Sequence, residues 1–314
     1  YHYMGGRSFG DVEDYAGRVM LLIDGYAVQD NLFDQAYIDE SGLIDLELVE
    51  RVEYVPGTGS VTYGNNALLG ILNVVTRRGR DFDGARVSAE VSSRGASRQR
   101  ATWGKRLESG AEVLLSASTL DIDGRNLYFP AYDTPATNFG VAEGLDGERN
   151  QRVFGKLSWS GWTVQAAWVE REKSVPTNPS AYTAFNTPFP TRDESAFLGV
   201  RHETDLGLQL SSSSSLMLGR YGYWNQREYA LNEDSEYDDG EKYGVRDFTG
   251  AWWRFDQKFV GRWFTDHTLV FGAELRDDHR QSFRRRFLAP DGEVTYRDDG
   301  ERSRRTVSLY IADD

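Results

Sequence analysis

From about residue 83 to the end of the chain, apolar and polar residues alternate with a period of two. The clearest examples are the segments 111–119, 153–159, 162–168, 251–259, 268–276 and 306–311. Because successive side chains of a β-strand point to opposite faces, each segment predicts a strand with one apolar and one polar side. Leu114 is an exception, since it is apolar at a position on the polar side. We count about ten strands, each roughly 9 to 15 residues long, which is enough to span a membrane.

The connections between these segments alternate between short and long. We predict short turns at 108–110, 160–161, 205–207 and 261–262, and long polar loops at about 121–150, 172–192, 228–244 and 280–302. A membrane-spanning barrel has short turns at one end of its strands and long loops at the other, whereas a soluble sandwich has no reason for this asymmetry.

Aromatic residues gather near the predicted strand ends. They are Trp103, Trp159, Trp162, Trp168, Tyr221, Tyr223, Trp224, Trp252, Trp253 and Trp263. Such residues suit the boundary between lipid and water. Packing in an ordinary β core is the alternative interpretation.

Composition excludes several classes of protein. A hydrophobic share of 39% is low for a soluble α/β enzyme but suits a barrel with a polar interior. The absence of cysteine excludes disulfides, thiol nucleophiles and cysteine-based metal sites. A net charge of -13 argues against a nucleic-acid partner, because binding to phosphates needs clustered Lys and Arg.

The first 80 residues have a different pattern, typical of a small mixed α/β unit. The apolar run 18–23 ends at Asp24-Gly25, which predicts a buried strand and a turn. A second strand is predicted at 52–55 and a third at 71–76, with a Pro-Gly break between them.

These segments resemble the plug domain of TonB-dependent outer-membrane receptors in both order and spacing. The matching residues are Leu22-Ile23-Asp24-Gly25, Val49-Glu50-Arg51-Val52-Glu53-Tyr54-Val55, Tyr63-Gly64 within 60–67, and Gly70-Ile71-Leu72-Asn73-Val74-Val75-Thr76. Tyr310 and Asp313 also resemble a "Tyr-x-Gln-Asp" strand of such barrels. The cation that the family usually has after the second strand is absent at 55–58, so the resemblance predicts no salt bridge between plug and barrel from there.

The resemblance implies a mainly β fold: a transmembrane antiparallel barrel with a small α/β plug domain. We expect about 22 strands in the complete protein and about ten here. Residues 1–79 would form the plug, with its first part and the TonB box upstream, and residues 80–314 the N-terminal portion of the barrel.

The resemblance also implies a function. Members of the family import a scarce solute, most often a ferric siderophore, across the outer membrane of a Gram-negative bacterium. TonB, with ExbB and ExbD, supplies the energy, and the barrel is surrounded by lipid and lipopolysaccharide. Import of cobalamin, haem or an oligosaccharide is an alternative, as is a barrel or adhesin that transports nothing. Neither a cofactor nor an enzymatic activity is implied.

Ligand contacts would come from plug apices and long loops that face one vestibule, because concave sites combine aromatic side chains with a few polar groups. The plug candidates are Tyr1, Tyr3, Met4, Arg7, Phe9, Gln29, Asn31, Phe33 and Tyr37. The loop candidates are Tyr128, Phe129, Tyr132, Tyr182, Phe185, Phe189 and Arg284. Alternatively, the loop aromatics pack against one another. Arg280 and the run 284–286 could attract an anionic chelate or pair with the acids of 291–301.

Other sites find no support in the sequence. The glycines at 57, 59 and 64 imitate a phosphate-binding loop but lack its spacing. The four histidines have no ligand spacing, and no Gly-x-Ser-x-Gly elbow is present. The acidic run 234–241 lacks the glutamate that ends an EF-hand loop, so we interpret it as a solvated loop.

Overall fold

The computed structural model describes residues 17–38, 40–57, 66–92, 95–176, 185–229, 243–264 and 266–313. A small N-terminal sheet has the strand order β2(Tyr26–Ala27), β1(Val19–Ile23), β4(Gly70–Thr76) and β3(Val49–Pro56). β1 runs parallel to β4, and the other two pairs are antiparallel. A 3-10 turn, η2(Leu46–Leu48), precedes β3 and is capped by Asp45. No helix among the described residues is long and apolar enough to cross a membrane.

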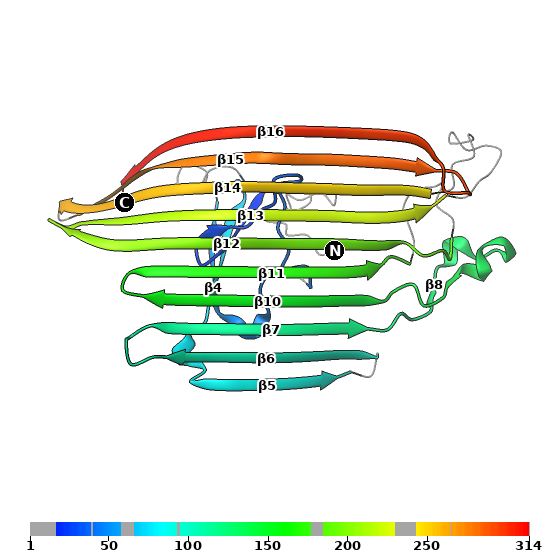
Figure 1. Cartoon of the computed structure of the whole chain (residues 1–314), viewed down its shortest axis with the longest axis horizontal. Coiled ribbons are helices and arrows are strands. Elements are labelled where there is room, and N and C mark those ends of the chain that lie inside the picture. The colour runs from blue at the N-terminus through cyan, green and yellow to red at the C-terminus, as the bar shows by residue number, and fades with distance from the viewer. Residues whose placement is uncertain are drawn as a thin grey trace.

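The rest of the described chain forms one antiparallel sheet, which we call the wall. Its ten strands are β5(Gly84–Val91), β6(Ala96–Arg106), β7(Glu112–Ile122), β10(Glu148–Trp159), β11(Trp162–Ser174), β12(Pro190–Gly207), β13(Leu210–Glu228), β14(Tyr243–Phe264), β15(His267–Leu288) and β16(Val294–Asp313). They lie side by side in chain order (Figure 1). The turn η3(Gly79–Asp81) joins the two sheets. The predicted mainly β class, with a large antiparallel sheet, and the count of about ten strands are therefore confirmed.

The long connections lie at one end of the wall, whereas the hairpin turns at the opposite end are short (Figure 1). The connection from β7 to β10 is the longest described in full, and it holds the hairpin β8(Leu127–Tyr128) and β9(Val141–Ala142) with the 3-10 turns η4(Pro130–Tyr132) and η5(Pro135–Gly140). We call this end of the wall the loop end.

The N-terminal sheet packs against one face of the wall, and the two share a core. Leu21, Ile23 and Tyr26 from the small sheet belong to the same buried cluster as Phe154 and Phe197 from the wall. Burial of such apolar surface is the main force that holds the sheets together. The face of the wall toward the small sheet is called the inner face below, and the opposite face the outer face.

Burial alternates along the wall strands as the sequence pattern predicts. Leu114, the exception to the pattern, is on the inner face and is completely buried in the shared core. Outer-face residues stay exposed, for example Leu115 and Val307, at 52% and 70%. Tyr221 and Trp252 are buried on the inner face, so interpreting them as lipid-boundary residues was wrong.

Three predicted connections are in different places. The turn expected at 205–207 is formed by residues 208–209, and 261–262 lie within β14. The long loop expected at 280–302 is wrong, because β15 and β16 continue through it and leave only residues 289–293 between them. Its charges face each other across the two strands, as Arg284 faces Asp299. Polarity here indicates paired charges on extended strands and not a loop.

Candidate functional site

Asp24 of the N-terminal motif binds both its own sheet and the wall. Its Oδ1 accepts a hydrogen bond from the amide of Thr76 (2.9 Å), and its Oδ2 accepts from Thr76 Oγ1 (2.6 Å) and from Lys156 Nζ of β10 (2.9 Å). Arg201 of β12 donates to the Asp24 carbonyl (2.8 Å). Gly25 follows with φ +82°, and a Cβ there would lie 3.0 Å from the Arg201 guanidinium. Glycine therefore permits both the turn and the close approach.

The other described motif residues form a chain of hydrogen bonds across β4 and β3. Asn73 accepts from the amide of Gly25 (3.1 Å) and donates to Glu53 (2.8 Å). Arg51 donates to Glu53 (2.9 Å) and pairs with Glu50 (3.1 Å). The bonds from Asn73 and Arg51 hold the pKa of Glu53 below its ordinary value. These motif residues tie the Asp-Gly turn to its neighbouring strands.

Arginines on the inner face of the wall bind carboxylates of the segment between β2 and β3. Arg100 contacts Asp45 (2.6 Å) and Glu47 (2.5 Å), and Arg152 contacts Glu40 (3.1 Å). Burial alone would raise the pKa of Asp45, but the amide of Glu47 and the guanidinium of Arg100 hold it below its ordinary value. In these contacts the cations belong to the wall and the carboxylates to the N-terminal part.

Asp30 shapes the loop that follows β2. Its carboxylate accepts hydrogen bonds from the amides of Leu32 and Phe33 (2.7 Å each) and of Gln35 (3.3 Å), and its own amide donates to the Gln35 carbonyl (2.9 Å). Burial raises the pKa of Asp30 to about 7, although these amides lower it. The closed loop presents Phe33 and Tyr37 to the wall.

Phe33 reaches a group of aromatic side chains on the inner face of β13–β15. Its ring centroid lies 5.9 Å from that of Phe248, 6.3 Å from Phe283 and 6.4 Å from Tyr221. The rings of Phe248 and Phe283 lie 5.2 Å apart at 60°. Tyr37 approaches Tyr221, with the two hydroxyls 3.2 Å apart. Loop and wall therefore build one aromatic surface.

Three arginines lie next to these rings, toward the loop end. The guanidinium carbon of Arg285 lies 5.8 Å from the Phe248 ring centroid, and that of Arg227 lies 5.2 Å from Phe189. Arg246 is directly opposite Arg285 on the neighbouring strand and interacts electrostatically with both other arginines. Arginines over aromatic faces can still donate hydrogen bonds to a ligand.

These three arginines concentrate positive charge on one face of β13–β15. Nearby ion pairs use a different arginine, since Arg284 contacts Asp247 (3.8 Å) and Asp299 (3.7 Å). In the part of the chain that the structure describes, no carboxylate pairs with any of the three. Like charges held together repel, and a bound anion relieves that repulsion. We name these side chains the arginine–aromatic cluster: Arg227, Arg246, Arg285, Phe33, Phe189, Phe248 and Phe283.

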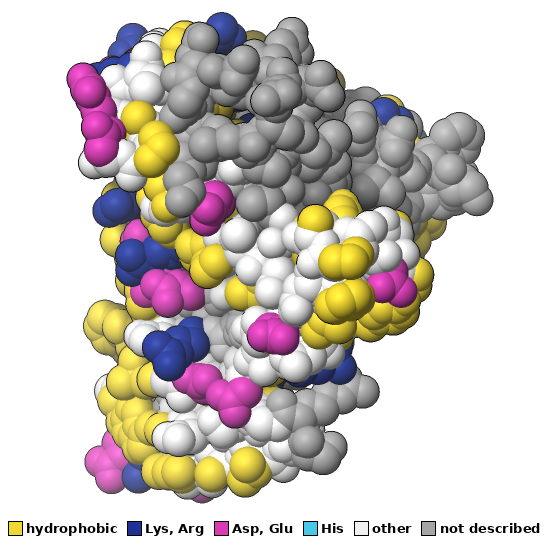
Figure 2. Space-filling model, turned by 90° about the vertical axis from the view of Figure 1, so that its right-hand side faces the viewer, with side chains coloured by type: hydrophobic (Ala, Val, Ile, Leu, Met, Phe, Trp, Pro, Cys, Tyr) yellow, Lys and Arg dark blue, Asp and Glu magenta, His cyan; other side chains and the backbone are white. Residues whose placement is uncertain are grey.

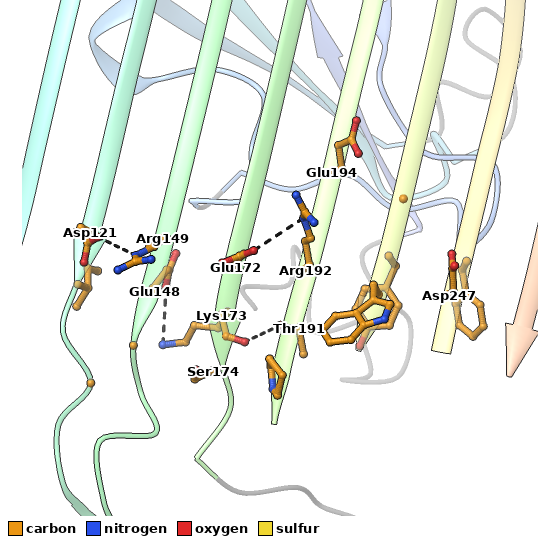
Figure 3. A pocket seen from close by; sticks show the side chains of 18 of the residues that line it. Asp121, Glu148, Arg149, Glu172, Lys173, Ser174, Thr191, Arg192, Glu194 and Asp247 are labelled. Carbon is orange, nitrogen blue, oxygen red and sulfur yellow. Dashed lines mark hydrogen bonds and ion pairs between the residues drawn. The ribbon is translucent and has the colours of Figure 1, made fainter. Parts of the chain in front are cut away.

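A hollow of about 860 Å³ also lies at the loop end, over β7 and β10–β14 (Figure 3). Its lining includes Asp121 and Arg149, which pair at 2.9 Å, and Glu172 and Arg192 at 4.0 Å. Basic and acidic side chains are likewise interspersed along one edge of this end in Figure 2. The strand alternation assigns these four residues to the outer face, away from the N-terminal sheet. The arginines of these two pairs are therefore already matched by carboxylates, whereas no described carboxylate pairs with the arginine–aromatic cluster, which we take as the candidate ligand site.

The four described ligand contacts predicted for the N-terminal part do not lie in one place. Phe33 belongs to the cluster, and Tyr37 lies beside it against Tyr221. Asn31 is hydrogen-bonded to the backbone of β14 and β15. Gln29 is buried within the small sheet, where it donates to a carbonyl of β1 (3.2 Å).

The predicted loop aromatics form a second group at the β8–β9 hairpin. The ring of Phe185 stacks on Tyr132 with centroids 4.7 Å apart and lies 6.2 Å from Phe129. Tyr128 donates to Asp133 (2.8 Å). These rings pack against one another, as the alternative interpretation held, whereas Phe189 joins the cluster under Arg227 and Arg284 is on the outer face.

Several predicted positions lie outside the described residues. They are Tyr1, Tyr3, Met4, Arg7, Phe9, Tyr63, Gly64, Tyr182 and the acidic run 234–241. Sequence reasoning missed the wall cations Arg100, Arg152 and Lys156 and the pair Arg246 and Phe248. Their common signal is a charged or aromatic residue at an inner-face position of an alternating strand.

The comparisons with known proteins agree with this architecture. A family model described as TonB-dependent Receptor Plug Domain matches residues 4–71. Among solved structures, the siderophore receptor PiuA from Acinetobacter baumannii aligns over 95% of this chain and 48% of its own, with 11% identity and a TM-score of 0.61. BauA, the ferric preacinetobactin receptor from the same organism, aligns over 94% and 47%, with 14% identity and a TM-score of 0.62.

A third structure, the ferripyoverdine receptor of the outer membrane of Pseudomonas aeruginosa, aligns over 94% of this chain and 43% of its own, with 14% identity and a TM-score of 0.60. The chain therefore spans about half the length of these structures and shares their fold. The plug model therefore matches the N-terminal part of the chain, and the wall has the same fold as the corresponding part of these receptors.

Proposed function

We propose that the chain is part of an outer-membrane receptor of a Gram-negative bacterium that imports a ferric siderophore. The observation that carries this proposal is the arginine–aromatic cluster at the loop end. It combines three guanidinium groups that pair with no carboxylate among the described residues with an apolar aromatic surface, which suits an anionic chelate with planar iron-binding groups. The similar structures include receptors named for ferric preacinetobactin and ferripyoverdine, which supports the same substrate class.

The proposal includes the domains and partners of the complete receptor. Residues 1–79 would be the plug and residues 80–314 the first portion of the barrel. TonB, with ExbB and ExbD, would supply the energy to move the plug. The barrel would be embedded in outer-membrane lipid and lipopolysaccharide, and its role would be transport and not catalysis.

The proposed ligand contacts are the cluster, Tyr37, and the predicted residues that lie outside the described part of the chain. Arg285 replaces Arg284 in this proposal, because Arg284 is on the outer face and is paired with two aspartates. The stacked loop aromatics Phe129, Tyr132 and Phe185 would flank the entrance.

A deletion of the gene tests the substrate class. The mutant is grown under iron limitation on a panel of ferric siderophores, haem and cobalamin. We expect loss of growth on at least one ferric siderophore and normal use of haem and cobalamin. A defect confined to haem or cobalamin would replace the siderophore with that solute, and no defect on any iron source would overturn the proposal.

The binding site is tested with the siderophore found in that panel. Arg285→Ala and Arg246→Ala in the full receptor should each weaken its binding about tenfold, as expected for the loss of a charge-assisted hydrogen bond. The matched control is Arg284→Ala, which removes the adjacent guanidinium from the outer face. Equal effects of all three substitutions would remove the cluster as the site.

A further inference from the structure

The hydrogen-bond ladder of the wall is interrupted where the loop after β2 meets it. The pairing of β14 with β15 shifts register between Ala251 and Trp253, and the pairing of β15 with β16 shifts between Asp278 and Gln281. Ala251 and Arg280 face each other at the edge of this interruption. Bulges of this kind leave backbone groups without a strand partner, and buried ones must find another.

Asn31 supplies that partner from the plug. Its Nδ2 donates to the carbonyl of Arg280 (3.0 Å) and to that of Ala251 (3.3 Å), so one amide serves both strands. Gln281 returns a hydrogen bond from its side chain to the Asn31 carbonyl. Asn31 is only 2% exposed, and breaking a buried arrangement of this kind leaves polar groups unsatisfied.

The wall is shaped for this contact by a glycine. A Cβ built on Gly250 would lie 2.0 Å from Asn31 Oδ1 and 3.2 Å from Leu32 Cγ. Any larger residue would therefore displace the plug loop. Gly222, which lies on the adjacent strand, has no such role, since a Cβ there would meet only Glu194 at 3.9 Å.

We call the contact of Asn31 with Gly250, Ala251, Arg280 and Gln281 the dock. It lies next to the proposed ligand site on the same two strands, β14 and β15. On β14, Gly250 follows Phe248 by two residues, and on β15 Gln281 precedes Phe283 by two. Residues two apart on a strand share a face and are separated by about 7 Å. Within the plug loop, Asn31 is likewise two residues from Phe33, which contacts both rings.

We propose that Asn31 is a positioning residue that docks loop 30–37 on the interrupted ladder and holds Phe33 in the arginine–aromatic cluster. The docking step rests on the contacts above alone, whereas the role of the cluster as a ligand site rests on the proposed function.

Hydrogen exchange in the complete receptor, without any ligand, tests the docking step. Asn31→Ala and Gly250→Ala should each speed exchange in a peptide spanning 29–38 by at least about fivefold, the effect of losing about 1 kcal/mol of hydrogen bonding. Because Gly250→Ala displaces the loop but leaves the Asn31 side chain in place, it distinguishes the effect of lost docking from the effect of removing the Asn31 amide. The control Gly222→Ala should leave this peptide unchanged. Unchanged exchange in both dock variants, with the receptor folded, would overturn the inference.

Discussion

Lys156 and Asp24 carry opposite charges at the junction between plug and wall. The Lys156 ammonium contacts Asp24 Oδ2 at 2.9 Å and Thr76 Oγ1 at 3.0 Å. Their side chains are only 13% and 11% exposed, so water screens either charge only weakly. Removing one member of a buried pair leaves the other uncompensated, which costs more than the pair itself contributes. Lys156 therefore fixes the Asp-Gly turn of the plug to β10.

Replacing Lys156 with methionine keeps the length of the side chain and removes its charge. We expect Lys156→Met to weaken docking of the plug by about 2 kcal/mol, below the range for fully buried pairs because some water reaches this one. Faster hydrogen exchange in a peptide spanning 70–76 would report the loss. Lys105→Met, at an exposed position of β6, is the control, and an equal response to both would contradict this role.

Asp30 makes the stability of the plug loop depend on pH. Its pKa is raised from 3.8 to about 7 in the folded loop, so between these values the folded state binds more protons than the unfolded one. Stability of the loop should therefore be greatest below about pH 4, fall as pH rises toward 7, and level off above it. Exchange in 29–38, corrected for its intrinsic pH dependence, should speed up accordingly. The side chain of Asp30→Asn cannot titrate. If exchange in 29–38 still depended on pH in the same way in that variant, titration of Asp30 would not be the cause.

At the scale of elements, the alternating pattern predicted most wall strands, because successive side chains point alternately to the outer face and to the inner face of the wall. Leu114 broke the pattern because it lies under the plug, in the apolar core that the two sheets share. Polarity failed as a guide at 280–302, where charges on adjacent strands face each other. Local sequence does not reveal which distant strand will neutralise a charge.

The β12–β13 turn offers a prediction at the same scale. Leu208 and Gln209 form it with φ of +51° and +59°, a conformation that side chains other than glycine and asparagine adopt at a cost of about 1 kcal/mol each. Leu208→Asn with Gln209→Gly should therefore raise the urea midpoint of barrel unfolding. The opposite sign is expected at the β10–β11 turn, where Gly161 has φ +83° and a Cβ would lie 2.5 Å from a carbonyl of β12. If Gly161→Ala and the double variant shifted the midpoint in the same direction, turn conformation would not be the cause.

For the whole molecule, the plug motifs were predictable and the contacts between plug and wall were not. The motif residues Asp24, Gly25 and Asn73 bind their own sheet, so their order in the sequence reflects a local requirement. The contact of Arg100 with Asp45 joins residues 55 positions apart. No periodicity marks such a pair, because it depends on how one finished sheet lies on another. Of the ligand cluster, Phe33 and Phe189 were among the predicted contacts and Arg285 was in the basic run 284–286, whereas Arg227, Arg246, Phe248 and Phe283 were missed.

The same contacts predict how the plug can be loosened without unfolding the barrel. Arg100 and Arg152 are buried between plug and wall and together contact Glu40, Asp45 and Glu47. Arg100→Met with Arg152→Met would leave carboxylates of the plug buried against an apolar wall, a repulsive change worth several kcal/mol. We expect faster proteolysis within 17–57 and higher ion conductance of the full receptor in planar bilayers, with unchanged heat-modifiable mobility of the barrel.

Arg149→Met with Arg192→Met is the matched control, because these arginines lie on β10 and β12 but on the outer face, where each is about half exposed or more. Acidification supplies an independent check on the same contact. The pKa of Asp45 is lowered in the folded state, so its salt bridge stabilises docking above the ordinary carboxylate pKa and is lost as pH falls through the depressed value. Wild-type conductance should therefore rise below about pH 4, whereas the inner-face double variant, already lacking the contact, should change little over that range. Two results would contradict this role of the arginines: a loosened plug in the Arg149→Met/Arg192→Met control, or an acid-induced rise in conductance as large in the Arg100→Met/Arg152→Met variant as in the wild type. Either result would mean that the shared apolar core is the main contact holding the plug.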